Sequence, residues 1–309
     1  MIHYDPRWSG PHGIGRFSDE VIARLPGTQP LSLAARRLSV LDPIATTLAA
    51  LRLRSGVYFT PGFNPPLRSS VPVVFCIHDL IHLRFPAEST FARRAYYRLV
   101  VGPAARRAFR VLTVSEYSRR EILDWSGLPE ERVVIVGNGV AAAFRPDGPR
   151  HEPGYPYFLH VGRRAAHKNV ERLLAAHAVS RCGRDVRLLF TGDLSDEQLA
   201  AHYRGAVALA FPSLYEGFGI PIIEAMSCGT PVLTSNATAI PETAGEGNAL
   251  VVDPQSVDSI AAGLDRLADD KALREDLRQR GLVRAAAFSW DQVGKKVNNV
   301  LRAAELLAP

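Results

Sequence analysis

Short and nearly continuous apolar runs recur along the chain, and longer stretches with helically spaced apolar positions lie between them. Apolar runs that alternate with helices are typical of parallel sheets covered on both faces. The predicted strands span 73–77, 111–115, 133–137, 157–162, 187–192, 209–213, 231–235 and 249–253. The predicted helices span 91–109, 118–127, 169–179, 195–206 and 258–288. This pattern predicts the α/β class, with doubly wound parallel sheets.

Proline and glycine are concentrated in the segment FRPDGPRHEPGYP at 144–156, directly before the predicted strand at 157–162. Such a segment is typical of a linker. We therefore predict two Rossmann-like domains, 1–148 and 149–290, and expect a C-terminal helix at about 291–309 to pack back on the first. Sheets of this type bind ligands beyond the carboxyl ends of their strands, so the predicted site is a cleft between the domains.

Charge is distributed unevenly between the two halves of the chain. Residues 1–150 carry 20 Arg and Lys against 12 Asp and Glu, a net charge of +8, whereas residues 151–309 carry 17 against 19, a net charge of −2. The basic half is predicted to face an anionic partner, such as a membrane surface, a phosphate-bearing acceptor or nucleic acid. Lysine occurs only at positions 168, 271, 295 and 296, which makes Lys168 conspicuous.

The composition also indicates a compartment. The 309 residues, 47% hydrophobic and 22% charged, are typical of a globular chain of about two domains. No apolar run reaches the roughly 18–20 residues that span a bilayer, and the N-terminal MIHYDPRWSG lacks a signal-peptide pattern. Cys76, Cys182 and Cys228 lack C-x-x-C spacing, so neither a disulfide nor a cysteine metal site is expected. We predict a cytoplasmic protein, at the inner face of the membrane if it binds lipid.

Two glutamates flank a glycine-rich bend in YEGFGIPIIEAMSC at 215–228. Gly217 and Gly219 permit a sharp turn, and the proline after them suits the first turn of a short helix, which is predicted over 221–227. The N-terminus of that helix offers unpaired N–H groups to an anionic or oxygen-rich ligand. Glu216 and Glu224 can accept hydrogen bonds from a diol on the two sides of the bend. The alternative, a plain strand–loop–helix with solvated glutamates, would be preferred if the E-G-x-G stood alone.

The segment GRRAAHKN at 162–169 follows one predicted strand and precedes a helix. Arg163 and Lys168 can neutralise a leaving diphosphate there, with Arg164 as a substitute partner. The sequence contains no D-x-D motif, which would hold a divalent cation on a nucleotide diphosphate, so we predict that no metal takes part. For GRRAAHKN in isolation, a solvated basic turn is the preferred alternative.

The longer string E-G-F-G-x-P-x-x-E-A-M-x-x-G-x-P-V resembles the signature of retaining glycosyltransferases of family four, which have the GT-B fold. The resemblance covers most of the chain, because other segments match in the expected order. They are HGIGRFSDEV (12–21), VVFCIHDLIHLRFP (73–86), LTVSEYSRREI (112–122), VGNGV (136–140), HVGRRAAHKNVERLL (160–174) and FSWDQV (288–293).

The resemblance implies that domain 1–148 binds the acceptor and that domain 149–290 binds the nucleotide sugar. It also implies a role for each matching position. It places His78 against the donor sugar, without acting as a general base, and it assigns the phosphates to Arg163 and Lys168. Glu216 would orient the transferred sugar, and Glu224 would bind the ribose. The other donor contacts that it implies are Gly13, Gly15, Leu194, Gly217, Phe218, Gly219, Ile220, Ser235 and Asn236.

The chain departs from the family in one respect. The family usually has an additional strand and helix between the helix after K-N and the strand before the S-D-E-x-L helix, whereas here a single predicted strand at 187–192 leads directly to the helix at 195–206. The first domain is also abbreviated between residues 25 and 58. Because the shortening lies near the expected nucleobase, it leaves the base undetermined. The basic and aromatic stretch at 90–110 leaves two alternatives open, an ordinary surface helix or docking at anionic lipid.

These observations predict a metal-independent, retaining transferase that moves a hexose from a nucleoside diphosphate sugar to a saccharide or lipid-linked acceptor. Mannose from a GDP donor is the family-level expectation, followed by UDP-hexoses, and surface polysaccharide assembly is the expected context. No cofactor and no nucleic acid partner is expected. Two rivals remain: a sugar phosphorylase on the same fold, and a catalytically idle subunit that binds a partner or lipid.

Overall fold

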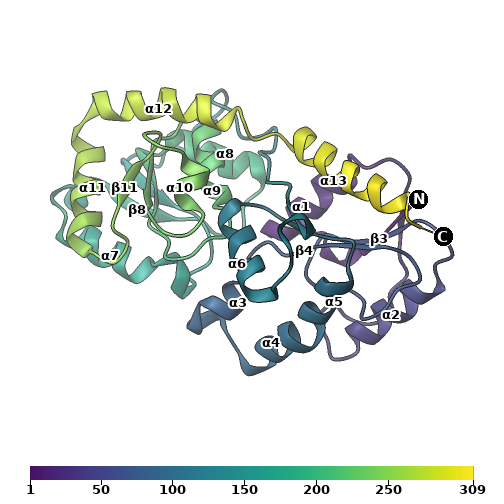
Figure 1. The fold of residues 1–309 in the computed structure, drawn as a ribbon. Coiled ribbons are helices and arrows are strands. Elements are labelled where there is room, and N and C mark those ends of the chain that lie inside the picture. Colours follow the sequence, from purple (N-terminus) through teal and green to yellow (C-terminus); the bar gives the residue numbers. More distant parts are fainter. Residues whose placement is uncertain (309) are drawn as a thin grey trace. The chain divides into compact units, whose positions relative to one another are not determined.

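The computed structural model describes residues 1–308, which form two compact α/β units (Figure 1). The first unit contains Met1–Gly139 and the segment from Trp290 onward, and the second contains Val140–Ser289. The boundary thus falls after Gly139, earlier in the chain than the position 148 expected from the linker composition. The assignment of acceptor and donor to the two units, and the cleft between them, stay predictions.

The sheet of the first unit is entirely parallel. Within the described residues it has six strands in the order β2-β1-β3-β4-β5-β6. Their bounds are β1 (Ile2–Tyr4), β2 (Thr28–Pro30), β3 (Val57–Thr60), β4 (Val73–Cys76), β5 (Arg110–Thr113) and β6 (Val133–Ile135). The apolar pattern predicted β4, β5 and β6 and missed the first three strands, which are only three or four residues long.

The helices of the first unit cover both faces of this sheet. They are η1 (Pro6–Trp8), α1 (Gly13–Ile22), α2 (Asp42–Arg52), α3 (Ile81–Arg84), η2 (Pro86–Glu88), α4 (Phe91–Tyr96), η3 (Tyr97–Val101), α5 (Gly102–Arg107), α6 (Glu116–Ser126), η4 (Glu130–Arg132) and α13 (Trp290–Glu305). The predicted helix at 91–109 is thus divided, because η3 is a π-helical turn before Pro103 in the first turn of α5.

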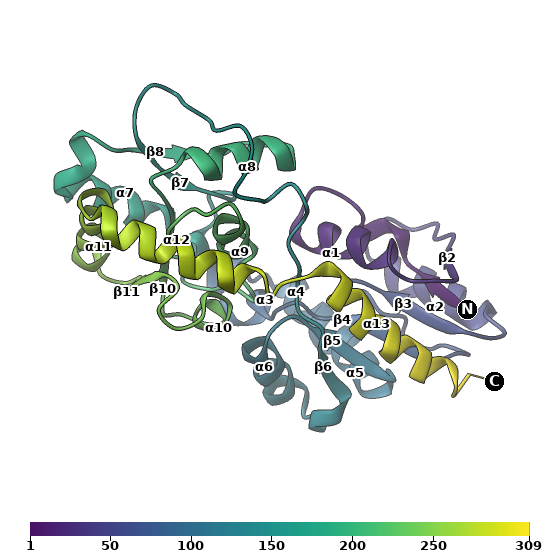
Figure 2. The same cartoon turned by 90° about the horizontal axis from the view of Figure 1, so that it is seen from above.

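Helix α13 returns from the second unit to pack on the first (Figure 2). Its buried positions Trp290, Val293, Val297 and Leu301 recur at intervals of three or four and form one apolar face. That face shares a core with residues of α1, which lies alongside, and of β3 and β4. The C-terminal segment is therefore an integral part of the first unit.

The sheet of the second unit is also parallel. In the part of the chain that the structure describes, it has five strands in the order β11-β10-β9-β7-β8. Their bounds are β7 (Tyr157–His160), β8 (Arg187–Phe190), β9 (Ala208–Phe211), β10 (Val232–Ser235) and β11 (Leu250–Val252). Strand β8 lies at the edge of the sheet and leads directly into α8 (Asp196–Gly205), which is the compact connection expected from the sequence.

Helices cover both faces of the second sheet as well. The others are η5 (Ala166–Lys168), α7 (Val170–Val179), η6 (Arg181–Arg184), α9 (Ile220–Ser227), α10 (Ile240–Ala244), α11 (Val257–Asp269) and α12 (Lys271–Ala285). Adjacent residues of β7 and β9 face opposite cores: Leu159 and Leu209 face α8 and α9, whereas Phe158 and Ala210 face α7 and α11. The doubly wound α/β fold predicted for the chain is confirmed.

Two further details concern the helices. The predicted helix at 258–288 is two helices, because Asp270 ends α11 and caps α12 by accepting a hydrogen bond from the Leu273 N–H. Helix α11 lies beside α7, and α12 crosses α9 (Figures 1 and 2). Among residues 1–308, no helix combines the length and the apolar character that crossing a bilayer requires.

Candidate functional site

Lys168 and Glu216 form a direct ion pair at the carboxyl edge of the second sheet. Lys168 ends η5, which follows β7, and Glu216 lies in the loop after the neighbouring strand β9. The Lys168 Nζ lies 2.6 Å from the Glu216 Oε1, and the side chains are only 15% and 13% exposed. The ammonium also lies 4.6 Å from the centre of the Phe211 ring. A cation and a carboxylate are therefore held together where ligands of such sheets bind.

The backbone of Glu216 is fixed by the loop after β10. Its N–H donates to the Thr238 Oγ1 at 3.0 Å, and its carbonyl accepts from the Ala239 N–H at 3.3 Å. Thr238 has a φ of 56°, in the left-handed region that a β-branched residue rarely adopts. Such strain persists only where the surrounding structure enforces it. No sequence pattern indicated this role of Thr238, because the role depends on the contact between two loops.

The glycine-rich bend forms as the sequence predicts. Gly219 has a φ of 97° and precedes α9, with Pro221 in the first turn. The helix begins at Ile220, one residue before the predicted start, and ends at Ser227 as expected. The Thr243 hydroxyl donates to the Phe218 carbonyl at 2.6 Å and holds the bend against α10.

Glu224 lies deeper than the diol-binding role suggests. Its side chain projects from α9 and is 3% exposed, and its Oε2 accepts a hydrogen bond from the Tyr203 hydroxyl of α8 at 3.0 Å. Tyr203 was predicted to lie in a helix, but nothing in the sequence indicated this contact. The ribose-binding role of Glu224 stays a prediction.

The remaining positions of the second unit are dispersed around this pair. Arg163 is exposed and makes no ion pair or side-chain hydrogen bond within residues 1–308, whereas the Arg164 guanidinium lies 4.9 Å from the centre of the Phe190 ring. The Ser235 hydroxyl donates to the Ser213 carbonyl at 2.6 Å, so it ties β10 to the end of β9. Asn236 is exposed, and Leu194 is half-buried in the turn before α8.

His78 follows β4 at the carboxyl edge of the first sheet. Its Nε2 lies 2.9 Å from the Pro61 carbonyl, and its ring packs edge-on against Phe17 with centroids 4.8 Å apart. Burial lowers the pKa of His78 to about 4, so the ring is neutral at neutral pH. With Nε2–H donating to the carbonyl, Nδ1 keeps a lone pair for a hydroxyl. The lowered pKa makes His78 a weak base, and its sugar-binding role stays a prediction.

The glycine loop at the start of α1 is held by contacts among its own residues. His12 caps α1, and its Nδ1 accepts a hydrogen bond from the Gly15 N–H at 2.8 Å. A Cβ at Gly15 would lie 2.1 Å from the Gly10 carbonyl oxygen, so only glycine fits there. The close approach to Gly10, rather than a free N–H group, therefore accounts for Gly15. Gly13 is the first residue of the helix and is exposed, and its donor contact stays a prediction.

Two family models match the chain. The model described as Glycosyl transferase 4-like domain matches residues 25–139, and the model described as Glycosyl transferases group 1 matches residues 179–284. An Escherichia coli protein named O-antigen chain mannosyltransferase B is 30% identical, with 89% of this chain and 81% of that protein covered. The chain belongs to the group 1 glycosyltransferases. Members of this family are retaining hexosyltransferases, so the family and the enzyme class expected from the motifs are confirmed.

Two further comparisons extend this result. The Escherichia coli protein named serotype-specific mannosyltransferase WbdA is 27% identical over 74% of this glycosyltransferase, which spans only 33% of that longer protein. The solved structure of sucrose-phosphate synthase from Thermosynechococcus elongatus superposes with a TM-score of 0.75 at 19% identity and covers 98% of both chains. That similarity establishes the GT-B fold.

Proposed function

We propose that this glycosyltransferase transfers mannose, with retention, from GDP-mannose to a saccharide or lipid-linked acceptor in surface polysaccharide synthesis. The observation that carries the transfer chemistry is the Lys168–Glu216 ion pair at the carboxyl edge of the second sheet. The choice of mannose and of the pathway is supported by the names of the two curated relatives, both mannosyltransferases and one of them acting on the O-antigen chain.

The two residues of the ion pair would bind different parts of the donor, Lys168 the diphosphate and Glu216 the sugar. A diphosphate competes with Glu216 for the Lys168 ammonium, because charge-assisted contacts to phosphate are among the strongest hydrogen bonds. When Lys168 turns to the phosphate, the Glu216 carboxylate becomes available to accept hydrogen bonds from sugar hydroxyls. Donor binding thus replaces one internal ion pair with contacts to both parts of the donor.

The other residues supply charge and orientation. Arg163 is exposed close in sequence to Lys168 and is assigned to the second phosphate. The N-terminus of α9, directly after the bend at Gly219, adds the positive end of the helix dipole, which favours the charge developing on the leaving diphosphate. In the first unit, the Nδ1 atom of the neutral His78 ring accepts a hydrogen bond from a sugar hydroxyl. Acceptor attack would occur on the face from which the diphosphate leaves.

The partners include an anionic membrane surface. The first unit exposes Ile44, Leu48 and Leu51 along α2, by 54%, 50% and 47%, with Arg52 and Arg54 exposed at the end of the helix. Apolar side chains flanked by arginines are typical of helices that lie in the interface of an anionic bilayer. This surface supports a location at the inner face of the membrane, where a lipid-linked acceptor would be found.

The proposed donor is tested with a panel of nucleotide sugars. The intact protein is incubated with GDP-mannose, GDP-fucose, UDP-glucose, UDP-galactose and UDP-N-acetylglucosamine, with and without EDTA, and thermal shift and donor hydrolysis are recorded. We expect the largest shift and EDTA-resistant hydrolysis with GDP-mannose. A preference for a UDP-hexose refutes the donor assignment, and no shift with any nucleotide favours the idle subunit. Release of a sugar phosphate from an oligosaccharide and free phosphate identifies a phosphorylase.

A further inference from the structure

The first unit contains a cavity of about 410 Å³ that no step of the proposed reaction has used. One wall consists of the aromatic rings of Phe63, His82, Tyr96 and Tyr97, and the loop at 38–40 forms another wall. Volumes from about 300 Å³ upward are typical of small-molecule sites, which combine mostly apolar walls with a few polar groups. The polar groups of the lining residues are the side chains of Ser39, His82 and Arg93 and the hydroxyl groups of Tyr96 and Tyr97.

The aromatic wall is a packed cluster. Phe63 stacks on Tyr97 with ring centroids 5.5 Å apart and 22° between the planes, and it lies 5.4 Å from Trp8 and 5.9 Å from His82. Phe63 follows β3 and His82 lies in α3, after β4, so the cluster lies at the carboxyl edge of the sheet. The rings therefore present a rigid face in the region where this fold binds ligands.

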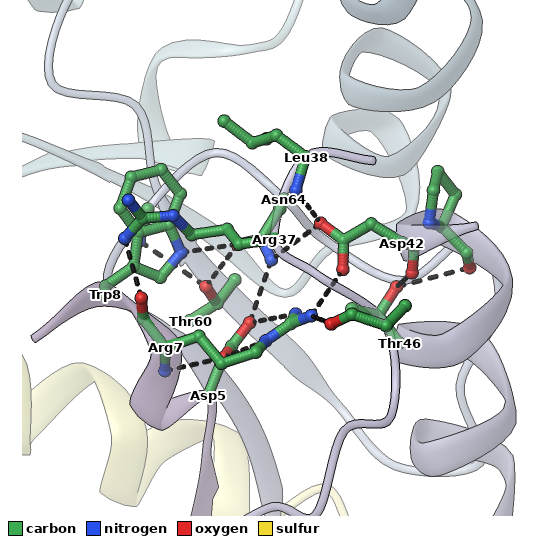
Figure 3. A network of polar contacts seen from close by, with 12 residues as sticks. Asp5, Arg7, Trp8, Arg37, Leu38, Asp42, Thr46, Thr60 and Asn64 are labelled. Atoms are coloured by element: carbon green, nitrogen blue, oxygen red, sulfur yellow. Dashed lines mark hydrogen bonds and ion pairs between the residues drawn. The ribbon is translucent and has the colours of Figure 1, made fainter. Parts of the chain in front are cut away.

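The loop wall is held by a buried network of ion pairs (Figure 3). The Arg7 guanidinium contacts the carboxylates of Asp5 and Asp42 at 2.6 and 2.8 Å, and both carboxylates are fully buried. Asp42 accepts a hydrogen bond from the Leu38 N–H at 2.7 Å, and Arg37 donates to the Arg7 carbonyl at 2.7 Å. Buried ion pairs add little net stability. A network that fixes the 38–40 loop is better explained by the geometry that it imposes.

The same loop wall carries backbone strain. Leu38 has a φ of 58°, a left-handed conformation that is rare for a bulky residue. Val40, two residues later, is 93% exposed although it lines the cavity. Strained residues are found preferentially at ligand sites, where the surrounding structure holds them. An apolar side chain held out into solvent in this way is typical of a surface that a ligand covers.

A short loop after β3 connects the cavity with His78. The Pro61 carbonyl accepts the His78 hydrogen bond at 2.9 Å, and Phe63 forms the aromatic wall two residues later. Asn64 donates to Asp5 at 2.8 Å and accepts from the Trp8 indole N–H at 2.6 Å, which ties the loop to the ion-pair network. The cavity, the network and the sugar-binding histidine thus share one rigid loop.

We propose that this cavity binds a pyranose ring of the acceptor saccharide, an inference that rests on the proposed transferase function. A pyranose presents an apolar C–H face and a rim of hydroxyl groups. The face suits the aromatic wall, because rings of this kind bury large apolar areas with defined geometry. Arg93 donates one N–H to the Glu88 carbonyl at 2.7 Å, and its guanidinium has further donors for the hydroxyl rim.

The polar groups favour a sugar over an acyl chain. Burial, together with the nearby Arg93, lowers the pKa of His82, so its ring is neutral and able to exchange hydrogen bonds with hydroxyl groups. An acyl chain would offer no partner to the Ser39 hydroxyl or to the Arg93 donors that the Glu88 carbonyl does not occupy, at a cost in free energy. The experiment therefore has to distinguish a saccharide in the cavity from a membrane lipid.

The test uses saturation-transfer difference NMR on the intact protein, with α-1,2- and α-1,3-mannobiose, maltose and α-galactobiose as probes. We expect saturation of the ring protons of at least one mannobiose. Arg93→Ala removes a donor, and Val40→Trp fills the cavity from an exposed position. Each should raise the dissociation constant of the probe by about tenfold or more. GDP-mannose hydrolysis without acceptor should stay unchanged in both variants.

Matched controls separate the cavity from general effects. Arg94→Ala removes the neighbouring exposed arginine, which does not line the cavity, and Val283→Trp adds the same bulk to an exposed residue of the second unit. Both should bind the probe as the original chain does. Equal probe binding by all variants, or no binding of any disaccharide while donor hydrolysis proceeds, overturns the cavity assignment and leaves the proposed function intact. Loss of anionic vesicle binding, without any effect on disaccharides, assigns the cavity to the membrane. Absence of both donor hydrolysis and disaccharide binding refutes the proposed function.

Discussion

Lys168 provides the sharpest test at the scale of single residues. Lys168→Ala should weaken GDP binding by about 10- to 100-fold, because a lost charge-assisted contact to phosphate is worth roughly 1.5–3 kcal/mol. The substitution also leaves the 13%-exposed Glu216 carboxylate without its cation, so the melting temperature should fall as well. Isothermal titration calorimetry with GDP checks the affinity.

A second lysine in the same unit serves as the control. Lys271 is exposed at the start of α12, so Lys271→Ala should change neither affinity nor melting temperature. Unchanged GDP affinity in Lys168→Ala would place Lys168 outside the donor site and would make its ion pair purely structural.

The two glutamates of the 215–228 segment should differ in which kinetic constant they control. Glu216 is assigned to the sugar, whose ring changes shape and charge as the bond breaks, so Glu216→Gln should lower the single-turnover rate without weakening GDP binding. Glu224 is assigned to the ribose, which is bound equally in ground and transition states. Glu224→Gln should therefore weaken GDP binding and have a smaller effect on the rate.

The burial of Glu224 requires its own control. Because Tyr203 donates to Glu224, Tyr203→Phe removes the same hydrogen bond and leaves the carboxylate in place. If Tyr203→Phe reproduces the loss of GDP affinity, Glu224 acts through the packing of α8 on α9 rather than through the ribose. A loss of GDP affinity in Glu216→Gln alone would reverse the two assignments.

At the scale of secondary structure, an element was predicted correctly where the residues that specify it are neighbours in the sequence. Strand β9 and helix α9 were predicted within one or two residues, because an apolar run, two glycines and a proline specify them locally. Strands β1 and β2 have three residues each and include polar side chains, so their pairing is decided by neighbouring strands. The division of 91–109 by a π-helical turn likewise depends on tertiary packing.

Helix α2 carries a prediction of membrane binding. Its exposed Ile44, Leu48 and Leu51 are spaced by three or four residues, so they share one face. The one acidic residue between positions 31 and 54 is Asp42, which is fully buried, so no carboxylate of this segment opposes an anionic surface. The double substitution Ile44→Ser with Leu48→Ser should lower binding to phosphatidylglycerol vesicles by about tenfold or more.

Vesicle flotation measures that effect. Val283→Ser removes an equally exposed apolar side chain from α12 in the second unit and should bind vesicles normally. Equal binding to neutral phosphatidylcholine vesicles would contradict the role of charge. If the double variant floats as well as the original chain, α2 is not the docking surface, and the 90–110 stretch becomes the candidate to examine.

At the scale of the whole molecule, the motifs predicted the fold, the family and the order of the site segments. They did not predict which side chains contact one another. The ion pair of Lys168 with Glu216 joins residues 48 positions apart in the chain, and Arg7 meets Asp42 across 35 positions. No periodicity in the sequence indicates contacts between residues so far apart in the chain. The burial of Glu224 and the strain at Thr238 were missed for the same reason, since both arise from elements packing against each other.

Two histidines with lowered pKa values make the stability of the chain depend on pH. Burial lowers the pKa of His78 in the first unit and of His160 in the second to about 4, from an ordinary value of 6.5. Between these values the unfolded chain binds more protons than the folded chain, so stability falls as the pH is lowered from 6.5 towards 4. His160 is fully buried and donates from Nδ1 to the Ala210 carbonyl, so protonation of Nε2 would leave a buried charge without an acceptor among the described residues.

The substitution His160→Gln isolates this contribution. It should flatten the decline of the melting temperature between pH 6.5 and 4.5, because a single histidine with this shift contributes roughly 2 kcal/mol between these two pH values. The two units need not unfold together, so thermal scans must be resolved into separate transitions. A slope that is identical in His160→Gln and the original chain would mean that His160 titrates normally in the folded protein, and that the acid sensitivity of the second unit comes from other groups.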